Sequence, residues 1–205
     1  MVLLATSAIL SLWFLLQFSD AGPSVLKTVV KTASVAILAL AAVAYGGPMA
    51  LAAALALGAT GDYFLSRPGE RAFLVGLVAF ALSHLAYIAL LLGAGAGWPG
   101  PVAYLMCAFG VVMAMALWPG AGALRLPVLG YIVVIVAMGV TALSIPAQAI
   151  IPAFLFIVSD TVLGLSLFVL RAESAFNRAA PYIIWGTYWA AQVGFLRVFT
   201  PGLSG

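Results

Sequence analysis

Charged residues are scarce in this 205-residue chain, and so are the residues used for sulfur and metal chemistry. Only 6% of the residues are charged, against about 25% in an ordinary soluble domain. The single cysteine, Cys107, excludes an internal disulfide and a cysteine-based metal cluster. The single histidine, His84, excludes a three-histidine zinc site. The net charge of +3 comes from basic residues scattered over short segments, so we expect no nucleic-acid partner.

Apolar sequence is abundant instead, with 66% hydrophobic residues and a mean hydropathy of +1.25. This composition predicts an integral membrane protein, in which only helices and closed barrels satisfy the backbone polar groups. The apolar runs are continuous and do not alternate with polar residues, which favours helices over barrel strands. We therefore expect an all-α polytopic transmembrane bundle, forming one domain over residues 1–205 in a bacterial inner (plasma) membrane.

Runs of about 20 apolar residues, broken by proline, glycine and charge, predict eight membrane spans. The spans are 2–18, 28–45, 48–66, 72–93, 101–118, 127–144, 149–170 and 180–199. No basic segment precedes the first run, so we expect a retained helix and not a cleaved signal peptide. Lysine and arginine lie at the first, third, fifth and seventh links and not in the second, fourth and sixth, with Arg197 as an exception. The positive-inside rule then places the odd-numbered links in the cytoplasm and both termini on the other side.

Two acidic residues, Asp62 and Asp160, lie inside the third and seventh apolar runs. A carboxylate at bilayer depth costs about 2.5–3.5 kcal/mol even on the gentlest insertion scale, so such groups mark functional sites. Counted from Arg67 and Arg171 at the cytoplasmic edge, Asp62 lies roughly 7 Å deep and Asp160 roughly 16 Å deep. We therefore expect a site within the membrane, with Asp160 as the deeper carboxyl group.

Further polar side chains lie in the spans near these aspartates. His84, nearer the midplane, can tune a carboxyl group or carry a proton, or it can be a hydrogen-bonded core residue. Lys31 can hold a lipid phosphate at the cytoplasmic interface or serve only as a topology determinant. Tyr188 and Gln192 are an i, i+4 pair on one face of the last span. The candidate substrate-binding residues are Lys31, Tyr63, Tyr87, Tyr188 and Gln192; the alternative roles are an interfacial or packing role for the tyrosines and a hydrogen bond between helices for Gln192.

Four short segments, in order on the third, fourth, seventh and eighth spans, together form a specific pattern. They are Gly61-Asp62 with Leu65, the run from Gly76 to Tyr87 that contains Ser83-His84, Ser159-Asp160 with Leu163, and Tyr188-Trp189-Ala190-Ala191-Gln192. This pattern resembles that of the YhhN-like lysoplasmalogenase family, and the likeness covers roughly residues 48–199.

The resemblance implies a polytopic membrane enzyme whose substrate is a lysophospholipid in membrane lipid. Characterised members of the family hydrolyse the vinyl ether bond of lysoplasmalogens. The products are a fatty aldehyde and glycerophosphocholine or glycerophosphoethanolamine. The family's two aspartates and its histidine correspond to Asp62, Asp160 and His84, which makes these the expected catalytic residues. The resemblance implies no metal and no other cofactor.

The expected reaction suits a pair of carboxyl groups. Hydrolysis of a vinyl ether begins with protonation of the outer alkene carbon and leaves an oxocarbenium ion, which water attacks. Glycosidases divide similar work between a carboxylic acid and a carboxylate. We hypothesise that Asp160, the deeper group, gives the proton because burial favours its neutral form. Asp62 is then the carboxylate, and the reverse assignment stays open.

Other functions are compatible with intramembrane carboxylates. A proton-coupled transporter also uses aspartate and histidine relays, although no internal repeat is visible here. A non-enzymatic lipid-binding membrane protein is a further alternative. An intramembrane aspartyl protease would carry Gly-x-Gly-Asp, which Ala59-Thr60-Gly61-Asp62 does not match. Ser83 and Ser159 lack the Gly-x-Ser-x-Gly elbow of serine hydrolases, so we do not expect them to be nucleophiles.

Overall fold

The computed structural model describes residues 1–95, 97–145 and 148–203, and within these residues it contains helices but no strand. Pro146, in the predicted sixth link, lies outside the described residues. The described elements are α1 (Val2–Gln17), α2 (Val25–Ala44), α3 (Met49–Leu65), α4 (Glu70–Gly93), α5 (Val102–Leu117), η1 (Gly122–Leu124), α6 (Arg125–Ala142), α7 (Ile150–Phe168), α8 (Ala175–Phe199) and η2 (Pro201–Leu203). Each α-helix coincides with one predicted span. The largest difference is at the start of α8, which begins at Ala175 and not at residue 180.

The lengths of the helices bear on how they relate to a membrane. By length and composition α2, α4, α7 and the segment Gly122–Ala142 can each cross a bilayer. The helices α1, α3 and α5 are apolar but shorter, at 16 or 17 residues. The 25 residues of α8 include Asn177, Gln192 and Arg197. The predicted class, an all-helical membrane bundle, is confirmed.

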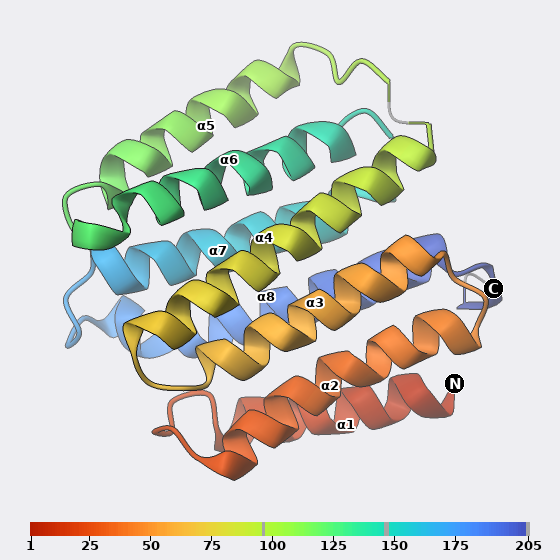
Figure 1. The fold of residues 1–205 in the computed structure, drawn as a ribbon, viewed down its shortest axis with the longest axis horizontal. Coiled ribbons are helices and arrows are strands. Elements are labelled where there is room, and N and C mark those ends of the chain that lie inside the picture. The colour runs from red at the N-terminus through yellow and green to blue at the C-terminus, as the bar shows by residue number, and fades with distance from the viewer. Residues whose placement is uncertain (96, 146–147, 204–205) are drawn as a thin grey trace.

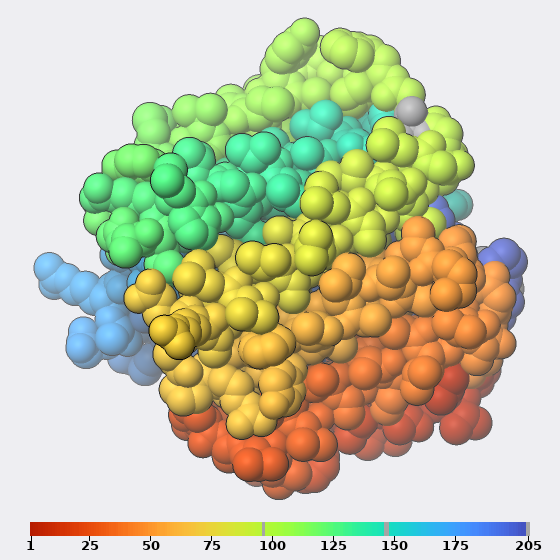
Figure 2. All heavy atoms as spheres, viewed as in Figure 1, coloured from red at the N-terminus to blue at the C-terminus, as the bar shows by residue number. Residues whose placement is uncertain are grey.

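Successive helices run antiparallel, and most of them lie side by side, whereas α6 separates α4 from α5 (Figure 1). The links α1–α2, α3–α4, α5–α6 and α7–α8 lie at one end of the bundle, and both chain termini lie at the other. The α7–α8 link projects beyond the packed body in the space-filling view (Figure 2). We call the end with these four links the basic end, because it carries Lys27, Arg67, Arg71, Arg125, Arg171 and Arg178. Its placement in the cytoplasm remains a prediction from the positive-inside rule.

Contacts between helices distant in sequence create the interior. The last helix, α8, packs along α7 and also contacts α1, α2 and α3, while α4 lies against α6. At the edge of the bundle, α5 contacts α6 and α7. Side chains from both halves of the chain therefore meet between α3, α4, α7 and α8.

Glycines in α3 allow two of these close contacts. A Cβ atom on Gly58 would lie 2.5 Å from the Nε2 atom of Gln192, and one on Gly61 would lie 2.5 Å from the ring of Phe80. Helices associate closely in lipid where one of them presents small residues. Hydroxyl groups add bonds between helices, since Ser83 donates to the carbonyl of Ala54 at 2.7 Å.

Candidate active site

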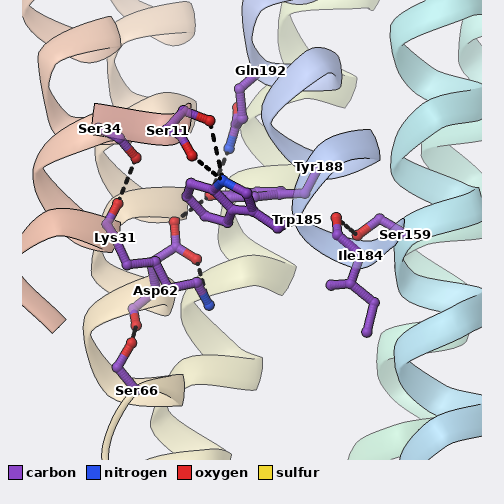
Figure 3. Close-up of polar contacts among 10 residues, drawn as sticks. All are labelled: Ser11, Lys31, Ser34, Asp62, Ser66, Ser159, Ile184, Trp185, Tyr188 and Gln192. Carbon is purple, nitrogen blue, oxygen red and sulfur yellow. Dashed lines mark hydrogen bonds and ion pairs between the residues drawn. The ribbon is translucent and has the colours of Figure 1, made fainter. Parts of the chain in front are cut away.

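Asp62 lies in the last turn of α3 and is almost completely buried, with 1% of its side chain exposed. Its Oδ1 atom is 3.1 Å from Nζ of Lys31 on α2. The hydroxyl of Tyr188 on α8 donates to its Oδ2 atom at 2.7 Å. Figure 3 shows both partners converging on the carboxylate from different helices. An opposite charge and a hydrogen-bond donor compensate the desolvation of the buried charge.

A chain of hydrogen bonds extends from Asp62 into the protein. The side-chain amide of Gln192 donates to the hydroxyl oxygen of Tyr188 at 3.0 Å. The hydroxyl of Tyr87 on α4 in turn donates to Oε1 of Gln192. All three side chains are buried, which fixes the Tyr188 hydroxyl against Asp62. The predicted i, i+4 pair of Tyr188 and Gln192 on one face of α8 is confirmed.

Trp185, one turn before Tyr188, forms the wall beside Lys31. Its indole N–H donates to the carbonyl and the hydroxyl of Ser11, at 3.0 and 3.1 Å. The Nζ atom of Lys31 lies 5.7 Å from the centroid of the Trp185 ring and 5.9 Å from that of Phe14. Aromatic faces attract cations at such distances, so the two rings help to hold Lys31 beside the carboxylate.

Asp160, on α7, has a different set of neighbours. The hydroxyl of Tyr131 on α6 donates to its Oδ2 atom at 2.6 Å. The Nε2 atom of His84 on α4 lies 3.2 Å from the same oxygen and 3.0 Å from the hydroxyl oxygen of Tyr131. The side chain of His84 is wholly buried, whereas 14% of the Asp160 side chain is exposed.

Both aspartates line one cavity of about 260 Å³. The described residues that line it include one cation, Lys31, and their polar members also include Tyr131 and Tyr188. Most of the remaining wall is apolar and comes from α4, α5, α6 and α7. The apolar part reaches Leu117 and Val128, where α5 ends and α6 begins, and so extends toward the basic end. The two carboxylates thus lie on the wall of a space suited to a hydrocarbon chain.

The structure brings some of the sequence-predicted residues to this cavity and not others. Asp62, Asp160, Lys31 and Tyr188 line it. Three further predicted residues are buried behind these: His84 behind Asp160, and Tyr87 and Gln192 behind Tyr188. Tyr63 is at the surface with 40% exposure, and its hydroxyl accepts a hydrogen bond from Arg67.

One sequence expectation is wrong: Asp160 is not the more buried carboxyl group. Asp62 is the more buried of the two, although it lies closer to the end of its helix. Depth along a helix axis does not determine burial, because the direction of the side chain decides what covers it. Both aspartates line the cavity, but Asp62 is covered by its partners on α2 and α8, whereas Asp160 is more open to the cavity.

Sequence reasoning missed two residues of the site, Tyr131 and Trp185. Tyr131 lies in the apolar run of α6, where nothing in the sequence distinguishes it from an interfacial tyrosine. Trp185 shares a helix face with Tyr188 and Gln192 through i+3 and i+7 spacing, and that spacing is a signal that could have identified it.

Together the fold and the cavity define a helical membrane protein with a mostly apolar interior cavity that two aspartates line. Residues 26–199 match the model of the YhhN family, and the chain belongs to this family. The chain is 36% identical over 188 residues to a protein named lysoplasmalogenase from Mycobacterium bovis (strain ATCC BAA-935 / AF2122/97). It is equally similar to a lysoplasmalogenase from Mycobacterium tuberculosis (strain CDC 1551 / Oshkosh). Each alignment covers 84% of this chain and 69% of the relative. No solved structure matches the chain.

Proposed function

We propose that this protein is a membrane-embedded lysoplasmalogenase-type hydrolase. It cleaves the vinyl ether bond of a lysophospholipid to a fatty aldehyde and a glycerophospho-headgroup. The names of its relatives support the substrate class. The observation that carries the proposal is structural: two carboxylates, from α3 and α7, line a single and mostly apolar cavity. A lysophospholipid needs an apolar space for its chain and acid–base groups at the ether.

The cavity wall suggests how such a substrate lies. The apolar residues of α5, α6 and α7 hold the hydrocarbon chain. Lys31 lies at the polar part of the wall, and 18% of its side chain is exposed. An ammonium group has three donors, so Lys31 can keep its contact with Asp62 and also contact the phosphate of the substrate. The vinyl ether, between chain and headgroup, then lies near the carboxyl groups.

In the first step Asp160 is the proton donor. Asp62 is paired with Lys31 and acts as the carboxylate, whereas Asp160 has no lysine or arginine partner among the described residues. Asp160 gives its proton to the outer alkene carbon, and the alkene electron pair forms the new C–H bond. The ether oxygen shares its lone pair and the inner carbon becomes an oxocarbenium ion. The negative charge of Asp62 stabilises this cation.

The second step consumes one water molecule. Water adds to the oxocarbenium carbon and gives one proton to Asp62, which yields a hemiacetal. As the hemiacetal collapses, Asp62 returns that proton to the glycerol oxygen, and the hemiacetal hydroxyl gives its proton to Asp160. The C–O bond breaks, the aldehyde and the glycerophospho-headgroup leave, and both carboxyl groups regain their starting state.

Mass spectrometry of released aldehyde tests this function. The purified protein is incubated with lysoplasmalogens that carry choline or ethanolamine headgroups, and with the saturated 1-O-alkyl analogue. We expect aldehyde from the vinyl ether lipids only, because the alkyl ether has no double bond to protonate. Absence of aldehyde above the heat-killed control with every headgroup would overturn the proposal. Proton-driven uptake without cleavage would favour a transporter instead.

A further inference from the structure

His84 and Tyr131 lie against Asp160, and the reaction steps above use neither. They come from α4 and α6, and both approach the same carboxylate oxygen, Oδ2. Tyr131 lines the cavity, whereas the side chain of His84 is wholly buried and lies behind Asp160. A role for His84 must therefore pass through Asp160 or Tyr131.

The geometry of the three groups favours a proton on the Nε2 atom of His84. The Tyr131 hydroxyl donates to Oδ2 of Asp160 at 2.6 Å, which leaves lone pairs on its oxygen that can accept. The Nε2 atom of His84 lies 3.0 Å from that oxygen and 3.2 Å from Oδ2, so a proton on Nε2 has two acceptors. The Nδ1 atom is buried without a hydrogen-bond partner among the described residues. A proton on Nδ1 would be an unpaired buried donor, which is unfavourable.

We propose that His84 and Tyr131 are positioning residues that hold Asp160 for proton transfer. His84 carries its proton on Nε2, and both groups donate toward Oδ2. Oδ1 is thereby left as the oxygen that meets the substrate, and the carboxyl plane is fixed by contacts to two helices. The effect of this arrangement on kcat rests on the proposed function, whereas the arrangement of hydrogen bonds around Asp160 does not.

The single histidine makes the hydrogen bonds directly measurable. Protein labelled with ¹⁵N-histidine in lipid nanodiscs has one imidazole to observe by NMR. We expect a protonated Nε2 and a non-protonated Nδ1, and a shift of the Nε2 signal in Tyr131→Phe and in Asp160→Asn. Tyr104→Phe is the matched control, because Tyr104 lies on α5 with 68% exposure and should leave the signal unchanged. A proton on Nδ1, or an Nε2 signal unmoved in both variants, would overturn the proposal.

The positioning role is tested by separating kcat from binding. Loss of a hydrogen bond to a catalytic carboxyl group predicts a fall in kcat of about 10–100-fold for Tyr131→Phe. We expect KM, and the affinity for the non-cleavable 1-O-alkyl lysophospholipid, to stay within about twofold, because a positioning residue acts in the transition state. Loss of analogue binding in parallel with kcat would indicate a merely structural role and overturn the proposal. If the wild-type protein releases no aldehyde, the proposed function fails, while the NMR result still decides the arrangement around Asp160.

Discussion

The carboxylate on α3 is paired with a lysine, whereas the carboxylate on α7 is held by a tyrosine and a histidine. The Asp62 cluster is closed, because its cation and its Tyr188 donor leave only 1% of the side chain exposed. The Asp160 cluster is open on one side, with 14% of the carboxyl side chain exposed. The two acidic residues of one cavity thus differ in their environment because they have different neighbours, and not because they lie at different depths along their helices. Enzymes obtain an acid and a base from two like residues in this way.

The largest difference between the clusters should appear on removal of the cation. Lys31→Met leaves Asp62 buried without its opposite charge, and we expect the free energy of unfolding to fall by about 3 kcal/mol. Unfolding in mixed micelles measures this value. The double variant Lys31→Met/Asp62→Asn removes both charges and should recover most of the loss. A loss below about 1 kcal/mol, the range of an exposed ion pair, would contradict the closed character of this cluster.

A smaller effect should follow from crowding the hydrogen-bond chain behind Asp62. Gly58→Ala places a Cβ atom 2.5 Å from the amide of Gln192, which is held between Tyr87 and Tyr188. We expect a loss of about 1–3 kcal/mol in the free energy of unfolding. Gly186→Ala on α8 is the matched control, because nothing lies within 4 Å of its added Cβ atom. Equal unfolding free energies for the two variants would show that the chain is not tightly packed.

The smallest of the three effects is expected at the open cluster. Tyr131→Phe removes one hydrogen bond from Asp160, and we expect about 1 kcal/mol of lost unfolding free energy because the carboxyl group still faces the cavity. The same micelle experiment, with Tyr104→Phe as control, measures it. A loss larger than that of Lys31→Met would reverse the comparison between the clusters.

Much of the fold follows from the sequence because lipid imposes a simple rule on it. Apolar runs of span length must be helices, so the eight predicted spans coincide with α1 to α8. The basic residues of the odd-numbered links likewise predict that these links lie at one end of the bundle. Arg67, Arg125 and Arg171 belong to these links, which do lie at a common end. The close approach of helices at Gly58 and Gly61 was also predictable, since small residues allow it.

The site was predictable only in part. The periodicity of a sequence shows which residues share a face of one helix, but it does not show which other helices pack against that face. Asp62, Asp160 and the Tyr188–Gln192 pair stand out within their own helices. The contact of His84 with Asp160 depends on α4 lying near α7, and Tyr131 joins them because α6 packs on both helices. These contacts are long-range packing outcomes, which hydropathy does not encode.

The rates of Asp62→Asn and Asp160→Asn in the aldehyde assay test most directly whether both carboxylates act on one bond. Each substitution keeps the size of the side chain and removes its acid–base chemistry. We expect each to lower kcat at least about 100-fold, while Asp20→Asn, in the exposed α1–α2 link, keeps normal turnover. Near-normal turnover in either cavity variant would contradict a shared site for the two aspartates.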